Sequence, residues 1–213
     1  KLGGVVDFQR QDGEQLTDWI CRQFKKAGKS IDTRDAGYLV FLCGDLMHDL
    51  SSEIGKIAAY CPHDRVTRED IDALAVPKVD AVAFKMTDAL AGKDFDRAAS
   101  VLADLLHARE SPVMILSVMG KYFRQLYTAR LYLDAGRTRG EYMDLWGMRG
   151  GYMEQQAQRL LDGARRFSPA WCRYAVRRCA ETDAAVKSAP RGQDGEVLTA
   201  LLVELASGRR AAV

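Results

Sequence analysis

The sequence is poor in the features that mark most enzymes and secreted proteins. Its 213 residues contain five cysteines and three histidines, with no CxxC, HxxxH or HExxH spacing. An odd, scattered set of cysteines argues against a disulfide framework and indicates reduced core thiols in a cytoplasmic protein. No apolar run approaches the ~18 residues that a membrane-spanning helix needs, so we expect no membrane association.

Motifs for nucleotide or acyl chemistry are also missing. The segment Gly147–Gly151 is glycine-rich, but it lacks the GKS or GKT ending of a phosphate loop and follows no predicted strand. We interpret it as a turn between helices. Acidic pairs such as Asp45 and Asp49 fit helix capping and the first-turn dipole, with Asp45 as the expected cap. The sequence therefore predicts no catalytic residue, cofactor site or metal ligand. The alternative, a small helical enzyme such as a metal hydrolase, would require bound metal.

Excess charge of one sign is absent too. The chain has 31 basic and 29 acidic residues and a net charge of +2, so bulk charge does not indicate a nucleic-acid binder. Basic residues do cluster locally near the C-terminus, where the candidates for nucleic-acid contact are Arg173, Arg177, Lys187 and Arg191. This cluster is either a solvated helix face or a surface that contacts phosphate or an acidic partner.

What the sequence has in abundance is helical periodicity, and alternation typical of strands is nearly missing. Most predicted helices are separated by Gly, Pro or a capping residue, and Pro77 is the expected boundary between a small unit and a larger one. The pattern therefore predicts an all-α fold. The expected helices span 12–27, 34–43, 46–60, a short segment from 67, 79–91, 94–108, 112–135, 138–146, 152–167, 169–187 and 193–206.

The longest predicted helix lies between Pro112 and Gly136. Proline is preset for the first turn of a helix, and glycine is a common stop. At three- and four-residue spacing one stripe of this helix carries mainly apolar side chains, which we expect to form the core of its bundle. The stripe consists of Ile115, Leu116, Met119, Tyr122, Phe123, Leu126, Arg130 and Leu133.

Several local patterns occur in the order found in the delta subunit of the bacterial DNA polymerase III clamp loader. Residues 50–60 read LSSEIGKIAAY and residues 66–71 read VTREDI. Phe84, Asp88 and Ala89 follow, and residues 183–187 read DAAVK. Each pattern alone is a packing pattern, but together they make nearly the whole chain resemble this family.

The resemblance implies an all-helical pair of domains from a three-domain subunit. Residues 1–9 would be the remnant of an AAA+-like first domain, with a last strand at Val5–Phe8. Residues 10–76 would form a three- to four-helix lid, and residues 77–213 a larger collar bundle through which the subunits oligomerise. The missing first domain is the part of the family that holds the sliding clamp.

The family likeness also implies partners and a role. The chain would be a non-catalytic subunit without an ATP site, acting in DNA replication to load the clamp onto primed DNA. Its partners would be the gamma/tau and delta prime subunits, with the clamp bound through the first domain. Aromatic residues are enriched at interfaces, so the expected contact residues are Tyr122, Tyr127, Tyr132 and Trp146. The rival interpretation is a stand-alone helical module that binds DNA through its basic C-terminal helices.

Overall fold

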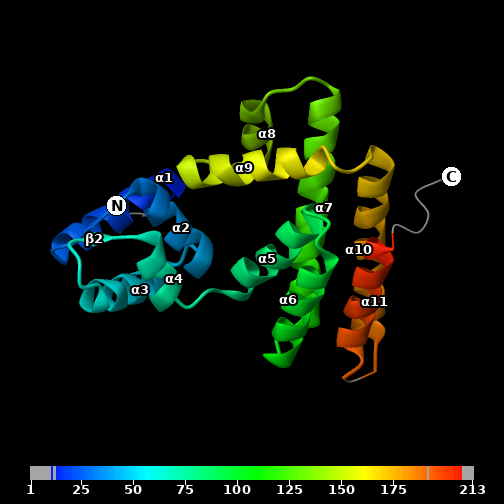
Figure 1. Ribbon diagram of the computed structural model, residues 1–213, viewed down its shortest axis with the longest axis horizontal. Helices are drawn as coiled ribbons and strands as arrows, with labels where there is room; N and C mark the ends of the chain where they lie inside the picture. Colours follow the sequence, from blue (N-terminus) through cyan, green and yellow to red (C-terminus); the bar gives the residue numbers. More distant parts are fainter. Residues whose placement is uncertain (1–10, 12, 191, 208–213) are drawn as a thin grey trace, which may run out of the picture. The chain divides into compact units, whose positions relative to one another are not determined.

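The computed structural model describes residues 11, 13–190 and 192–207. Eleven helices and one pair of two-residue strands make up this part of the chain, which confirms the predicted all-α fold (Figure 1). The expected strand at 5–8 lies outside the described residues. No helix in the described ranges is long and apolar enough to cross a membrane.

The described residues divide into two compact units. Unit 1 contains the chain up to Val76 together with Met148–Met153, and unit 2 contains Pro77–Gly147 and the chain from Glu154 onward. Helix α9 (Gly151–Ala164) therefore begins among the residues of unit 1 and ends among those of unit 2.

Unit 1 is built from four short helices. These are α1 (Gly13–Lys26), α2 (Thr33–Cys43), α3 (Met47–Tyr60) and α4 (Arg68–Leu74). Their apolar faces meet in a core that includes Leu16, Phe24, Leu39, Ile57 and Ile71, all at most 2% exposed. Burial of such side chains stabilises each helix more than its intrinsic propensity does.

The loops of unit 1 contain a feature that the periodicity did not predict. Strands β1 (Ser30–Ile31) and β2 (Arg65–Val66) pair in parallel, with Ser30 opposite Arg65 and Ile31 opposite Val66. The expected cap of α3 was also wrong by one residue, because Leu46 rather than Asp45 occupies the N-cap position. Extended backbone at Leu46 supports this start, although its side chain supplies no capping hydrogen bond.

Unit 2 is organised around α7 (Pro112–Asp134), which has 23 residues. Helices α5 (Val79–Ala91), α8 (Arg139–Trp146), α10 (Pro169–Ser188) and α11 (Asp194–Ala206) all contact it. Helix α6 (Phe95–His107) packs on α5 and α11 (Figure 1). The predicted stripe of α7 is largely confirmed, since its first six members are buried.

Glycine at two turns of the chain explains how the α8–α9 connection is made. Gly147 ends α8 in the left-handed conformation with φ 62°, and Gly150 precedes α9 with φ 87°. Residues with a Cβ rarely adopt such angles, so glycine is favoured at both places. The prediction of a turn between helices at 147–151 is thus confirmed.

Candidate subunit interface

The four aromatic residues expected at an interface differ in how deeply they are buried in unit 2. Tyr122 is only 3% exposed, and its ring makes edge contacts with Phe84 and Phe123 at 5.9 Å between centroids. Its position on the apolar stripe of α7 directs it into the core, so Tyr122 is a core residue and not part of the surface. Burial also raises the pKa of its hydroxyl well above the ordinary value, with Asp88 adding to the shift.

The other three aromatic residues are half-buried and lie near the end of α7 and on α8. Tyr132 makes an edge contact with the buried Tyr142, at 6.0 Å between ring centroids. The indole Nε1 of Trp146 is buried and has no hydrogen-bond partner among the described residues. Two leucines on the same pair of helices are unusually open to solvent, Leu131 at 45% and Leu145 at 57% exposure. Helices α7 and α8 thus both carry exposed aliphatic side chains next in sequence to half-buried aromatic ones.

The basic residues expected to contact nucleic acid are partly neutralised. Arg177 pairs with Glu181 at 3.5 Å, and Lys187 pairs with Asp183 at 2.5 Å, each one helical turn away. Arg173 is exposed and is not in an ion pair within the described part of the chain. Arg191 lies outside the described residues. Because carboxylates accompany two of these cations, the α10 surface is more mixed than the sequence cluster indicated.

A groove of about 430 Å³ runs between α7 and α10. The two helices are antiparallel, since Gly120 faces Cys179 and Phe123 contacts Trp171. Apolar and small side chains form most of the groove, and charged groups stand at its rim. Its lining residues are Val113, Leu116, Ser117, Gly120, Arg124, Val176, Cys179, Ala180, Asp183 and Lys187.

A buried thiol in the groove has no sign of reactivity. Burial raises the pKa of Cys179 to about 12, although Arg124 and Arg178 lower it. The sulfur is therefore protonated at neutral pH, and the thiolate is the nucleophilic form of cysteine. Cys179 acts here as a small apolar side chain.

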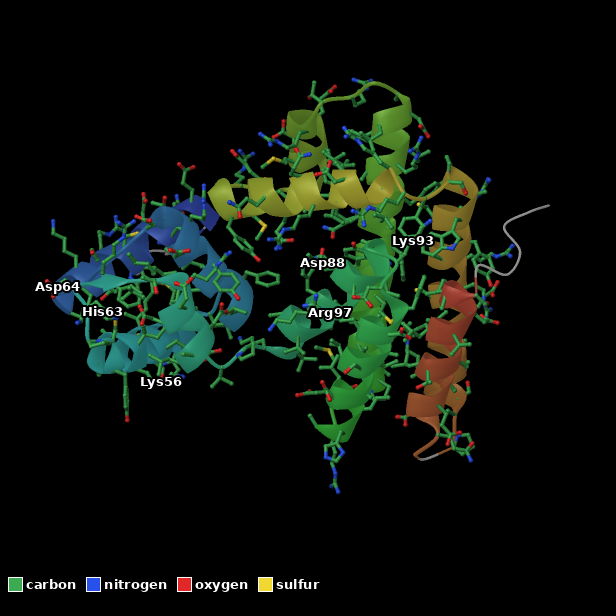
Figure 2. The ribbon with its side chains drawn as sticks, in the orientation of Figure 1. Lys56, His63, Asp64, Asp88, Lys93 and Arg97 are labelled. Carbon is green, nitrogen blue, oxygen red and sulfur yellow. The ribbon has the colours of Figure 1, made fainter. Side chains whose placement is uncertain are left out.

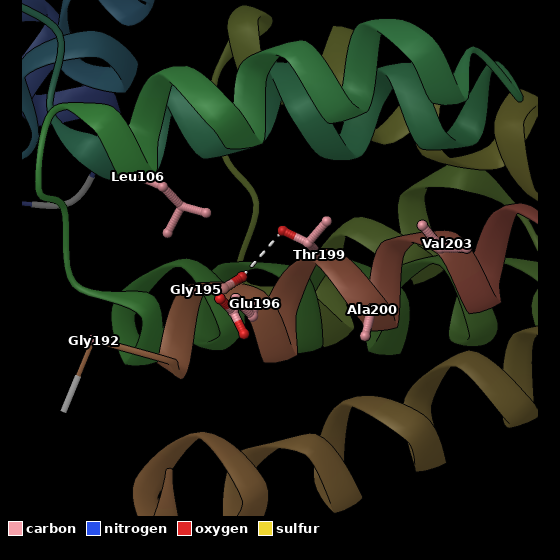
Figure 3. A pocket seen from close by; sticks show the side chains of 7 residues that line it. All are labelled: Leu106, Gly192, Gly195, Glu196, Thr199, Ala200 and Val203. Carbon is pink, nitrogen blue, oxygen red and sulfur yellow. Dashed lines mark hydrogen bonds between the residues drawn. The ribbon is translucent and has the colours of Figure 1, made fainter. Parts of the chain in front are cut away.

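A second, more open hollow lies between the end of α6 and the outer side of α11. Figure 3 shows the side chain of Leu106 facing α11, where Gly195 is close and Thr199 donates a hydrogen bond to the Gly195 carbonyl at 3.1 Å. A Cβ at position 195 would lie 3.3 Å from Leu106, so glycine permits this approach. The hollow measures about 650 Å³, and Val203 on its border is 61% exposed.

Some charged side chains elsewhere make local contacts. Figure 2 shows Lys56 on α3 and Lys93 and Arg97 around the α5–α6 turn. Lys56 pairs with Glu53 at 2.6 Å, and the Lys93 ammonium lies 5.3 Å from the centre of the Phe167 ring. Among the described residues, no group of three or more His, Cys, Asp or Glu side chains is placed to hold a metal ion.

The sequence prediction missed the groove and two cations beside it. Lys121 and Arg124 are exposed on α7, on the side opposite the apolar stripe. Lys121 and Arg124 follow Ser117 by four and seven residues, and residues at this spacing share a helix face. The sequence could therefore have predicted a polar, basic face on this helix. The partner helix α10 is distant in sequence, so the periodicity of α7 alone did not reveal a groove.

These features define a class of protein: a two-unit helical bundle whose candidate site is an extended surface. The family model for the C-terminal domain of the DNA polymerase III delta subunit matches residues 80–204, which is more than half of the chain. The chain belongs to this family, as its sequence patterns indicated.

Two relatives agree with this assignment. The chain is 24% identical over 157 residues to the probable DNA polymerase III subunit delta of Aquifex aeolicus, over 73% of this chain and 45% of that protein. The solved structure of the Bacillus subtilis DNA clamp loader delta protein has a TM-score of 0.70 and 19% identity. That match covers 94% of this chain and 58% of the other. The chain thus spans about half the length of the relatives it matches. The likeness to the Bacillus subtilis structure shows that the two proteins share a fold.

Proposed function

We propose that this chain acts as part of the non-catalytic delta subunit of a bacterial clamp loader, joining the other loader subunits in the cytoplasm to place the sliding clamp on primed DNA. The observation that carries the proposal is the family match, because residues 80–204 make up nearly all of unit 2. In this proposal unit 1, within residues 10–76, is the lid, and residues 77–213 form the collar.

The partners in this proposal are the gamma/tau and delta prime subunits. The surface around Tyr127, Tyr132 and Trp146 supports an assembly role, since Leu131 and Leu145 leave apolar area exposed beside it. Apolar and aromatic surface of this kind is typical of interface cores. Contiguous exposed apolar area often marks a protein interaction site.

The proposal is tested by mixing this chain with the ATPase and delta prime subunits of the same organism and measuring the complex mass by light scattering after gel filtration. We expect one copy of the chain in a stable complex. Full-length delta subunit provides the positive control. If full-length delta associates and this chain stays free under the same conditions, the scaffold role of these two units is wrong.

The rival function, DNA binding by the chain alone, is disfavoured by one observation. Glu181 and Asp183 neutralise Arg177 and Lys187, so the cluster offers few free cations to phosphate groups. We expect weak binding of the isolated chain to a labelled single-stranded oligonucleotide. Tight binding that falls steeply with salt would instead favour the rival.

A further inference from the structure

The groove between α7 and α10 is lined in part by small residues. Gly120, Ser117 and Ala180 have small or no side chains. Small residues let the backbone of a packed helix approach closely, and helices pack by placing ridges of side chains into such grooves. Val113, which is 39% exposed, and the half-buried Val176 supply apolar contact.

The rim of the groove carries free positive charge. Arg124 lines it, and Lys121 precedes Arg124 by one helical turn on the exposed side of α7. Arg173 continues the line of Val176 and Ala180 on α10 at helical spacing. Within the described residues none of these three cations has a carboxylate oxygen within 4.0 Å, whereas Arg177, Arg178 and Lys187 all do.

We propose that this groove binds an acidic amphipathic helix of a neighbouring clamp-loader subunit. Apolar residues of that helix pack on Val113 and Val176, and its carboxylates pair with Arg124, Lys121 and Arg173. Charge complementarity of this kind orients partners and raises their rate of association. The inference rests on the proposed function, because it names the chemistry of one partner contact.

A protein partner fits the groove better than nucleic acid does. None of its ten described lining residues is aromatic, so bases have no ring on which to stack. The apolar base also matches aliphatic side chains rather than sugars.

Two variants test the groove, each with a matched control. Arg124→Glu reverses a rim charge, and Ala180→Trp fills the space that a helix would occupy. The controls are Lys85→Glu on the exposed side of α5, and Ala185→Trp on α10 away from the groove. Circular dichroism and the melting temperature show whether each variant keeps its fold. A Ser117 variant that carries a photo-crosslinking benzoylphenylalanine identifies the bound segment.

The measurement is the Kd for the ATPase and delta prime subunits of the same organism. We expect Arg124→Glu to raise this Kd about tenfold and Ala180→Trp about thirtyfold or more, with the controls near wild type. The crosslink should fall on a partner helix rich in Asp and Glu. If the wild-type chain binds and both groove variants bind equally well, the inference is wrong and the proposed function stands.

Two other results separate the remaining possibilities. If the wild-type chain fails to bind where full-length delta does, the proposed function itself fails. If Arg124→Glu leaves subunit binding unchanged and instead weakens binding of a labelled single-stranded oligonucleotide, the occupant is nucleic acid and the protein-helix proposal is overturned.

Discussion

The two units use their polar side chains in different ways. In unit 1 these groups join segments that are distant in sequence. The Lys29 ammonium donates hydrogen bonds to the carbonyl oxygens of Cys61 at 2.9 Å and His63 at 2.7 Å. Arg65 pairs with Asp32, and the Tyr38 hydroxyl donates to Asp72 at 2.5 Å. Loops and helix ends of unit 1 are therefore fixed by its own charges.

In unit 2 most ion pairs among the described residues join side chains three or four residues apart. Arg130 with Asp134 and Lys187 with Asp183 are pairs one turn apart. Long helices explain the difference, because α7 and α10 have 23 and 20 residues and bury a continuous core. A unit held by such a core depends less on polar contacts between distant segments, and we infer that partners bind on its surface.

The largest effect should come from the core of unit 2. Phe123 is 1% exposed and contacts both Tyr122 and Trp171. Replacing Phe123 with Ala leaves a cavity in the contact between α7 and α10, and we expect a loss of about 3–5 kcal/mol of unfolding free energy. Urea unfolding measures the loss. Phe123→Leu is the control and should lose less than half as much.

Hydrogen exchange of peptides from the two units then tests the comparison directly. Faster exchange in α7 and α10 is the expected response to Phe123→Ala. Unchanged exchange there would show that the core of unit 2 does not depend on this ring.

In unit 1 the next largest effect should come from a polar contact. Lys29→Met keeps the length of the side chain but removes both hydrogen bonds to the carbonyl groups of Cys61 and His63. We expect a loss of about 2 kcal/mol, since charge-assisted hydrogen bonds are stronger than neutral ones and two acceptors lose their partner. Lys25→Met on the exposed end of α1 is the control. Equal stability of the two variants would mean that the Lys29 contacts do not stabilise unit 1.

A glycine in α2 should respond in the opposite way from a glycine in α3. A Cβ at Gly37 would lie 2.9 Å from the Cβ of Tyr152, which packs on Tyr38 and Phe41. Gly37→Ala should therefore destabilise unit 1 by about 1–2 kcal/mol. Gly55 has no neighbouring atom within 4 Å, so Gly55→Ala should stabilise its helix by about 0.5–1 kcal/mol.

Thermal unfolding of the two glycine variants compares them under one set of conditions. A melting temperature that rises in both variants would show that the segment Met148–Met153 shifts easily away from α2.

Much of the fold was predictable because its signals are local. Helix α5 begins and ends where its periodicity and flanking residues predicted, at Val79 and Ala91. The capping box that starts α4 was readable from Thr67 and Asp70. The β1–β2 pair was not predictable, because two-residue strands have no periodicity and their pairing joins Ser30 to Arg65. The packing of Tyr152 beside Gly37 depends likewise on a contact between distant segments.

The candidate site was less predictable than the fold. Tyr122 was expected at an interface from its residue type, yet its place on the apolar stripe decided its burial. The ion pairs of Arg177 and Lys187 were readable from the i,i+4 spacing of Glu181 and Asp183. Arg124 became notable only when α10 was seen beside it, since a groove requires both helices.

The two units share one local motif, a capping box, and here the expected effects are small. The Thr67 hydroxyl accepts a hydrogen bond from the backbone N–H of Asp70, whose carboxylate accepts from the Thr67 N–H at 2.9 Å. Thr138 and Glu141 make the same arrangement at the start of α8. Thr67→Ala should cost about 1 kcal/mol, measured by urea unfolding, and Thr67→Ser should restore most of it.

Acid should weaken both capping boxes. The backbone N–H of Thr67 holds the pKa of Asp70 below its ordinary value, and the N–H of Thr138, with Arg137, does the same for Glu141. A lowered pKa in the folded state means that the contribution to stability is full above the unfolded pKa of about 4 and disappears as the pH falls through the folded pKa. Asp70→Asn and Glu141→Gln should therefore each flatten the fall in stability between about pH 5 and pH 2, measured by urea unfolding at a series of pH values. If the two variants show the same dependence of unfolding free energy on pH as the wild type, other carboxylates determine the loss of stability in acid. The capping boxes would then not give the two units a common response to acid.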